Sequence, residues 1–328
     1  MNDWRKQLKY DPTPLLLNSS DKAVVYFTKR DILDEKVKPI TFVWGLPEPQ
    51  KILRKQQVNG SWKKSGANPV IYPPNHYELV ETFKNFRILV ERYQFTKDHP
   101  AILKAAEFLF SFQTPEGDIR GFIGNQYATY YTGYVLSLLI KAGYEADPRI
   151  DKGINWLLAM RQNDGGWTIP LLTHEYDRDT WNKLTSEYAE PLQPDQTQPF
   201  SHNWTDMVLR AFATHPQYRK LTEAKAAGTL LKSSFFQKDF YTSYQSAKYW
   251  TRFIHWWPNL ITALDVLSLL GFTKDDPDIE KGLNWFITNQ QPDGLWKLES
   301  SKVVSQKDTL KRQWLSLNIY RVLPRFFS

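Results

Sequence analysis

The stretch Pro277–Trp296, PDIEKGLNWFITNQQPDGLW, decides the fold, because the stretch Pro148–Trp167, PRIDKGINWLLAMRQNDGGW, repeats most of it. The two stretches align without a gap at a constant offset of 129 residues. Both begin with proline, share an Asn-Trp pair and end in Asp-Gly-x-Trp. A repeat of this length is a supersecondary unit that buries its apolar face only by stacking on neighbouring copies. The fold is therefore expected to be an array of such units.

Two weaker copies lie upstream, PAILKAAEFLFSFQTPEGDI from Pro100 to Ile119 and QQVNGSW from Gln56 to Trp62. Apolar residues at helical spacing accompany the copies, which predicts pairs of helices. The first helices of the pairs are expected to start near residues 22, 77, 127, 203, 257 and 309. The long step between 127 and 203 contains residues 168–202, which we interpret as a functional insertion.

The two helices of a pair differ in polarity. The first helices are apolar, as in YVLSLLI at Tyr134–Ile140, whereas the second helices carry charges on one face. An apolar helix is buried and an amphipathic helix faces water on one side. This pattern predicts an all-α fold, an (α/α) toroid of five or six helical hairpins with inner and outer rings around a central pocket. Residues 1–328 are expected to form a single domain, with an irregular lead-in at 1–21 and the insertion 168–202 over the pocket rim.

The composition points to an apolar cavity. The chain has 13 Trp, 17 Tyr and 19 Phe, and Trp and Tyr favour sites that are apolar at one end and polar at the other. We interpret them as the lining of a cavity for a hydrophobic small molecule. The net charge of +7 permits peripheral contact with an anionic membrane, but no basic run is dense enough to predict nucleic-acid binding. The sequence predicts no particular oligomeric state.

The protein is predicted to be cytoplasmic, with peripheral membrane contact as a further location. It has no Cys, so disulfide and thiolate chemistry are excluded. No secretory signal is visible at the N-terminus. No stretch approaches the roughly 20 apolar residues of a membrane span.

A turn pattern recurs at Gln56–Trp62, Gln113–Ile119, Arg161–Trp167 and Gln290–Trp296, with Gln or Arg first, Gly fifth and an apolar residue, mostly Trp, last. It resembles the QW motif of the terpene cyclase and protein prenyltransferase superfamily. The resemblance implies structural roles, in which Gln caps backbone groups, Gly adopts positive φ and Trp packs under the next helix. The segment DKAVVYFTKRDIL, residues 21–33, together with QQVNGSW, is similar to bacterial stand-alone prenyltransferase and squalene-cyclase repeat proteins, which mostly lack an assigned reaction.

The resemblance implies a place to look for a catalytic acid. Squalene-hopene-type cyclases protonate an alkene with an Asp-x-Asp-Asp box at the start of an inner helix, and this sequence has no such box. The closest equivalent is SHNWTD, residues 201–206. Asp206 is the first candidate for a working acid, with His202 or Asn203 beside it.

Two further acids, Asp177 and Asp179, lie in the insertion and are secondary catalytic candidates. Their alternative interpretation is a solvated loop, and Arg178 between them would favour their ionised forms. The zinc site of protein prenyltransferases uses a cysteine, so it cannot exist here in its usual form.

The other candidates are aromatic, histidine and carboxylate residues expected near the pocket rim, where aromatic faces could stabilise carbocations. The predicted substrate-binding residues are Tyr130, Tyr131, Asn203, Trp204, His255, Trp256, Trp257, His76 and Glu81. A divalent metal held by His76, His202, His255 and His174 is a minor alternative, and no other cofactor is predicted. Capping or stacking is the commoner role for such histidines.

Three functions stay open at this point. The first is a cyclase-like or prenyl-transferring protein that acts on, or only binds, an isoprenoid-type ligand in the cavity. The second is a carbohydrate-active (α/α) barrel, a lyase or glycosidase, in which Trp257, His255 and Tyr130 would line a cleft. The third is a non-catalytic binding or interaction toroid.

Overall fold

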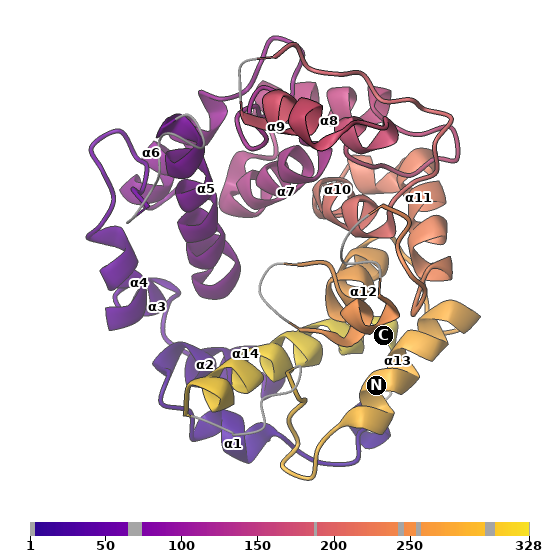
Figure 1. The fold of residues 1–328 in the computed structure, drawn as a ribbon. Helices are drawn as coiled ribbons and strands as arrows, with labels where there is room; N and C mark the ends of the chain where they lie inside the picture. The colour runs from indigo at the N-terminus through magenta and orange to yellow at the C-terminus, as the bar shows by residue number, and fades with distance from the viewer. Residues whose placement is uncertain are drawn as a thin grey trace. The chain divides into compact units, whose positions relative to one another are not determined.

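The computed structural model describes residues 4–64, 74–186, 189–241, 246–253, 257–298 and 306–327. The chain divides into two compact units: a central unit, Pro47–Leu230, and a terminal unit, which joins Met1–Leu46 to Leu231–Ser328. The described residues form helices and turns, with isolated β-bridges and no β-strand (Figure 1). The predicted all-α fold of repeated helical hairpins is confirmed. Closure of the hairpins into a ring and the single domain stay predictions.

The central unit contains the middle hairpins of the chain. α5 packs against α6, and α7 packs against both α8 and α10. Its helices are α4 (Pro47–Leu53), α5 (Pro74–Arg87), α6 (Pro100–Phe110), α7 (Thr129–Leu139), α8 (Pro148–Ala159), α9 (Arg178–Ser186), α10 (His202–Thr214) and most of α11 (Thr222–Ser233). Short 3-10 helices lie at Pro170–Thr173 and Tyr218–Lys220.

The terminal unit brings the beginning and the end of the chain together. α14 packs against α1, α2 and α12. The helices are α1 (Thr13–Leu17), α2 (Lys22–Phe27), α3 (Thr41–Trp44), α12 (Leu260–Leu269), α13 (Pro277–Asn289) and α14 (Gln306–Val322), with 3-10 helices at Trp4–Gln7, Ala247–Thr251 and Leu323–Phe326. The lead-in was expected to be irregular, but it contains a short helix, α1, in which Leu16 is buried.

Three of the apolar helices end in a widened π-helical turn. These turns are η2 (Thr28–Ile32) after α2, η3 (Ile88–Arg92) after α5 and η4 (Ile140–Tyr144) after α7. π-turns inside helices often accompany functional sites. The fourth residue of η2 is Asp31 and the fourth residue of η3 is Glu91. Asp31 is bound by Arg321 and Glu91 by Arg87.

The proline-initiated helices form as the repeat predicted. α6, α8 and α13 each begin with proline, where the missing N–H has no intrahelical partner to lose. The preceding residue caps each helix: the side chains of His99, Asp147 and Asp276 accept hydrogen bonds from backbone N–H groups of the first turn. The three helices present one buried and one exposed face, whereas α7 and α10 are buried almost throughout.

Two of the recurring turns bind their repeat to the following one. The side-chain amide of Gln56 donates to the carbonyls of Gly60, 2.9 Å away, and of Ala101, 2.8 Å away in α6. Gln113 does the same to Gly117 and to Arg149 in α8. The turn glycines have positive φ, +89° at Gly60 and +122° at Gly117, a region that favours glycine.

The closing tryptophans are also structural. Trp62, Trp167 and Trp296 are each 2% exposed or less, and each indole N–H donates to a carbonyl ten residues earlier in the chain. The backbone N–H of Trp62 binds Thr82 Oγ1 of α5, and that of Trp167 binds Thr205 Oγ1 of α10. The scaffold roles expected for the motif are what the structure shows.

Close packing of α7 on α10 depends on one glycine. A Cβ at Gly133 would lie 2.6 Å from Val208 Cα, closer than real Cβ atoms approach. Because Gly133 has no side chain, the two helix backbones come together and bring the residues of their first turns close to one another.

The insertion contains the helix α9, and its second half is bound by hydrogen bonds to Asn125 and Gln126. Among the described residues, no helix combines the length and apolar character needed to cross a membrane.

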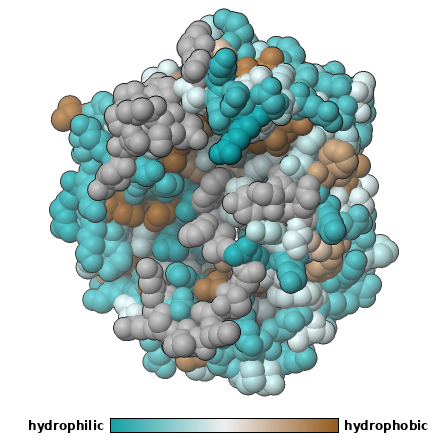
Figure 2. All heavy atoms as spheres, in the orientation of Figure 1, coloured by the Kyte–Doolittle hydropathy of each residue, from teal (hydrophilic) through white to brown (hydrophobic). Residues whose placement is uncertain are grey.

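On the face drawn in Figure 2 the coloured atoms are mostly hydrophilic, with hydrophobic atoms in separate patches.

Candidate functional site

The first turns of α7 and α10 carry one group of aromatic side chains. The ring centroids of Tyr130 and Trp204 lie 4.5 Å apart, and those of Tyr130 and Tyr131 lie 4.4 Å apart. Phe122 stacks on Tyr131 at 3.9 Å, and Phe83 of α5 meets Tyr131 edge-on at 5.2 Å. These five residues are the aromatic cluster of the central unit.

The aromatic cluster combines buried rings with partly exposed ones. Phe83, Phe122 and Trp204 are buried, whereas Tyr130 and Tyr131 are partly exposed. Burial raises the pKa of both tyrosines well above the ordinary value, and their hydroxyls share a hydrogen bond. Both phenols are therefore neutral, and the partly exposed surface that they offer is aromatic rather than ionic.

The beginning of α10 places the predicted acid and its neighbours. Ser201 caps the helix by accepting a hydrogen bond from the backbone N–H of Trp204, 3.3 Å away. His202 and Asn203 are both buried in the first turn. Asp206 lies one turn further along and is 1% exposed. The structure therefore places Asp206, His202, Asn203 and Trp204 on neighbouring turns of one buried helix.

Asp206 forms a buried ion pair with Arg210. Arg210 Nη2 lies 2.6 Å from Asp206 Oδ2, and the guanidinium carbon lies 4.4 Å from the ring centre of Tyr134. A cation at this distance favours the ionised carboxylate. A general acid must carry a proton, so this geometry works against the acid role predicted for Asp206.

A second carboxylate, the partly exposed Glu91, lies near the same arginine. Tyr134 Oη donates to Glu91 at 2.8 Å, Lys141 Nζ lies 3.1 Å away and Arg87 Nη1 lies 3.8 Å away. Burial alone would raise the pKa of Glu91, but Lys141, Arg87 and Arg210 together lower it below its ordinary value. Glu91 is therefore also a carboxylate and not a proton donor.

Sequence reasoning missed this charged network of Glu91, Tyr134, Arg210 and Asp206. One signal was present, because Asp206 and Arg210 are four residues apart on a helix and such pairs face each other. The partnership of Glu91 with Tyr134 had no comparable signal, since 43 residues separate the two.

The predicted histidine site does not assemble among the described residues, where no three His, Asp or Glu side chains gather as metal ligands. His76 Nδ1 lies 3.0 Å from the carbonyl of Gly121, and burial lowers its pKa. His174 Nε2 lies 2.8 Å from the carbonyl of Gln193. His255 lies outside the described residues.

The other predicted site residues have different surroundings. Glu81 is partly exposed and lies 3.6 Å from Lys84, so it is not a buried acid. Asp177 accepts a hydrogen bond from the backbone N–H of Thr180 at the start of α9, which lowers its pKa. Asp179 is exposed. Trp257 belongs to the terminal unit, and its carbonyl accepts from Asn259.

Trp256 lies outside the described residues, like His255. The role of both as substrate-binding residues stays a prediction.

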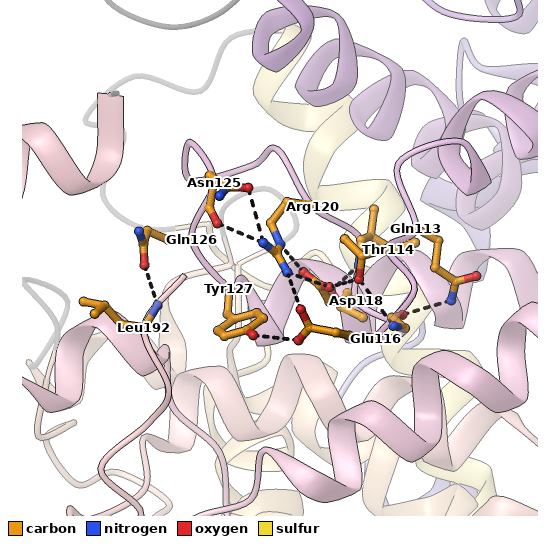
Figure 3. Close-up of polar contacts among 12 residues, drawn as sticks. Gln113, Thr114, Glu116, Asp118, Arg120, Asn125, Gln126, Tyr127 and Leu192 are labelled. Atoms are coloured by element: carbon orange, nitrogen blue, oxygen red, sulfur yellow. Dashed lines mark hydrogen bonds and ion pairs between the residues drawn. The ribbon is translucent and has the colours of Figure 1, made fainter. Parts of the chain in front are cut away.

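A polar turn after α6 holds the insertion in place (Figure 3). Arg120 donates to both oxygens of the buried Asp118, at 2.5 and 3.1 Å, and to the carbonyl of Asn125. Tyr127 donates to Glu116 at 2.6 Å. Burial, and to a smaller extent this neighbouring carboxylate, raises the pKa of Tyr127 to about 12. These hydrogen bonds link residues 116–127 to one another, and we call this turn the polar platform.

The insertion lies on this platform through backbone contacts. Gln126, 1% exposed, accepts from the N–H of Leu192 at 3.0 Å and donates to the carbonyl of Glu190 at 3.1 Å. Asn125 donates to the carbonyl of Ala189 at 2.7 Å. The second half of the insertion is therefore anchored to the loop that leads into α7 and the aromatic cluster.

In part of its length the chain resembles squalene-hopene cyclases. The family described as squalene-hopene cyclase C-terminal domain matches residues 78–189, which include α7 and the aromatic residues of its first turn.

Individual relatives are more distant. A probable squalene–hopene cyclase of Sinorhizobium fredii (strain NBRC 101917 / NGR234) is 25% identical over 148 residues. That match covers 41% of this chain and 23% of the relative, so the matched part spans about a quarter of that protein's length.

Two solved structures are similar at low identity. A protein from Actinoplanes is 14% identical, with a TM-score of 0.47 and 88% of each chain covered. A variant of the type II terpene cyclase MstE from Scytonema, in complex with its substrate geranylgeranyl dihydroxybenzoate, is 12% identical, with a TM-score of 0.45, covering 96% of this chain and 99% of that one.

Proposed function

We propose that this terpene-cyclase-like protein binds a hydrophobic, isoprenoid-type ligand against Tyr130, Tyr131 and Trp204. The observation that carries the proposal is the aromatic cluster, in which two partly exposed tyrosines are held by three buried aromatic rings. The match to a squalene-hopene cyclase family over residues 78–189, which span much of this site, supports the same ligand class.

The chemistry of the cluster suits such a ligand. Aromatic rings bury apolar surface and present electron-rich faces, to which alkenes and developing carbocations are attracted. Rings that already contact one another lose little side-chain entropy when a ligand binds. The neutral hydroxyls of Tyr130 and Tyr131 would hydrogen-bond a polar end of the ligand without adding charge.

Binding without proton transfer is the second candidate function. It is favoured by the ion pair between Asp206 and Arg210 and by the lowered pKa of Glu91, because neighbouring cations favour the ionised form of both acids. A carbohydrate-active site needs a protonated carboxyl beside a carboxylate, and these two acids do not offer one. Proton donation by Asp206, assisted by His202 or Asn203, would require the ion pair to open.

The test is direct binding of geranylgeraniol to the purified protein, measured by isothermal titration calorimetry. Tyr130→Ala is expected to weaken binding about tenfold, since an aromatic contact contributes about 0.5–1.5 kcal/mol beyond its buried area. Tyr176→Ala, at an exposed tyrosine of the insertion, is the matched control and should bind like the original protein. Absence of binding, or equal binding by Tyr130→Ala, would overturn the proposal.

Location is proposed from composition alone. The net charge of +7 and the lack of cysteine support a cytoplasmic protein that touches anionic membranes. Co-sedimentation with vesicles of phosphatidylcholine and phosphatidylglycerol tests the membrane contact. Binding that vanishes at about 0.5 M salt would support it, because exposed charges are screened at that ionic strength.

A further inference from the structure

The insertion contains a loop that is closed at its neck by two hydrogen bonds. The backbone N–H of Asp195 donates to Oγ1 of the buried Thr173 at 2.9 Å, and His174 Nε2 lies 2.8 Å from the carbonyl of Gln193. Residues 175–192 lie between the two sides of this neck. The loop therefore leaves the central unit and returns to it at one fixed place.

The returning arm of the loop, residues 189–200, is bonded to the central unit at several points. Its first residues are bound by Asn125 and Gln126. Further along, the buried side chain of Gln162 donates to the carbonyl of Asp195 at 2.8 Å. Moving this arm would break all of these hydrogen bonds together.

The outgoing arm, residues 175–186, carries α9 and is held more weakly. None of the residues of α9 is buried. Among the described residues, the side chains of α9 have no hydrogen bond or ion pair with any residue outside the insertion, and those of Thr185 and Ser186 donate to carbonyls of α9 itself. A segment with few buried contacts opens at a lower free energy than one that is buried and bonded.

The end of α9 lies close to the aromatic cluster. A Cβ at Gly124 would lie 2.7 Å from the carbonyl oxygen of Thr185, so α9 touches the chain at this glycine. Two residues before Gly124, Phe122 stacks on Tyr131 with ring centroids 3.9 Å apart. Movement of α9 away from Gly124 would therefore change the surroundings of the cluster.

We propose that α9 is a lid beside the aromatic cluster, which turns about the neck of the insertion and opens to let an isoprenoid-type ligand reach Tyr130 and Tyr131. This inference rests on the proposed function, because it assigns a route to the same site. The returning arm keeps the lid attached while α9 moves. Closure after the ligand has entered excludes water from the site, as lids do in many enzymes.

The mobility of α9 is tested by hydrogen exchange and mass spectrometry. α8 is the matched control, since it is a helix of the same unit with one buried face. The amides of α9 are expected to exchange at least about tenfold faster than those of α8, because less free energy is needed to open α9. Exchange in α9 as slow as in α8 would overturn the proposal.

A disulfide that locks the lid tests its role in binding. The chain has no cysteine of its own, and an ideal Cβ on Gly124 lies 3.6 Å from Thr185 Cα. Gly124→Cys together with Thr185→Cys therefore places two thiols within bonding reach. After oxidation, the double variant should take up geranylgeraniol at least about tenfold more slowly than the same protein reduced with dithiothreitol, because the lid cannot open.

Uptake is followed by stopped-flow tryptophan fluorescence, and the outcomes separate the two proposals. If the original protein binds no geranylgeraniol, the proposed function is wrong and the route to its site is wrong with it. If the original protein binds but the oxidised and reduced variants take up the ligand equally fast, only the lid is wrong.

A further measurement on the original protein covers the case in which the double variant does not fold. Geranylgeraniol should slow hydrogen exchange in α9 and leave exchange in α8 unchanged, because the bound ligand favours the closed lid. Bound ligand with unchanged exchange in α9 would overturn the lid.

Discussion

The side chain of Gln290 binds the backbone of Tyr10, 280 residues earlier in the chain. Gln290 Nε2 donates to the Tyr10 carbonyl at 2.8 Å, and the Tyr10 N–H donates to Gln290 Oε1 at 3.0 Å. Gln56 and Gln113 make the corresponding contact with the next proline-initiated helix. The last recurring turn therefore holds the start of the chain as the turns of Gln56 and Gln113 hold the repeats that follow them.

The first prediction concerns the glycine of that turn. Gly294 has a φ of +78°, and a Cβ there would lie 2.7 Å from Pro12 Cα. Gly294→Ala is expected to destabilise the protein by about 2–4 kcal/mol, because backbone strain and a clash with the lead-in add together. Urea denaturation measures the change.

The control is Gly271→Ala. Gly271 has a similar φ, +84°, but nothing lies within 4 Å of its added Cβ. This variant should lose only about 1 kcal/mol from the strained backbone. Equal losses in the two variants would show that the contact of Gly294 with Pro12 does not contribute to stability.

The second prediction concerns the buried ion pair of α10. Asp206→Asn leaves the Arg210 charge without its carboxylate, and loss of one partner of a buried pair costs about 3–5 kcal/mol. The double variant Asp206→Leu with Arg210→Met removes both charges and should recover most of this loss. The stabilities of the single and double variants are compared by their urea denaturation midpoints. A double variant less stable than Asp206→Asn would contradict the prediction.

The third prediction is a pH dependence at Glu91. Its pKa in the folded protein is below the ordinary value of 4.5, so its ionised form stabilises the fold above that pH. This stabilisation is lost as the pH falls below about 4.5 towards the lowered pKa. Glu91→Gln should therefore be less stable than the original protein at pH 7, with a difference that shrinks in acid.

Stability is measured by thermal unfolding between pH 7 and pH 3. Glu145→Gln, whose side chain is exposed, serves as the control and should follow the original protein across the range. A Glu91→Gln deficit that stays constant down to pH 3 would argue against an ionised Glu91.

The fourth prediction concerns the anchor of the insertion. Gln126→Leu removes two hydrogen bonds to the backbone of Glu190 and Leu192, each contributing about 1 kcal/mol. Trypsin cleavage after the exposed Lys183 of α9 should become about tenfold faster, because local opening controls proteolysis. Gln217→Leu, at an exposed position of the same unit, should cleave at the original rate.

Much of the fold could be predicted from short-range patterns. The prolines at 100, 148 and 277 begin helices, and the glycines of the recurring turns have positive φ, as expected. The helix α1 in the lead-in and α9 in the insertion were not predicted, because both are short. Neither carries enough periodic residues to be distinguished from a loop.

The candidate site was only partly predictable. The aromatic residues Tyr130, Tyr131 and Trp204 do lie together, and their value as a binding surface stays a proposal. The protonation state of Asp206 was expected to suit an acid, but it depends on Arg210 beside it. A carboxylate in an apolar helix looks the same in sequence whether its partner is a cation or a substrate.

The sequence by itself determined the repeat, the helical hairpins and the turns that join them, since these depend on backbone preferences and polarity patterns within a few residues. Only the tertiary structure decided the partners of the charged groups: Glu91 with Tyr134, and Arg321 with Asp31. Such partnerships join segments far apart in the chain. Their strength comes from the burial that packing imposes on both side chains together, which no local pattern encodes.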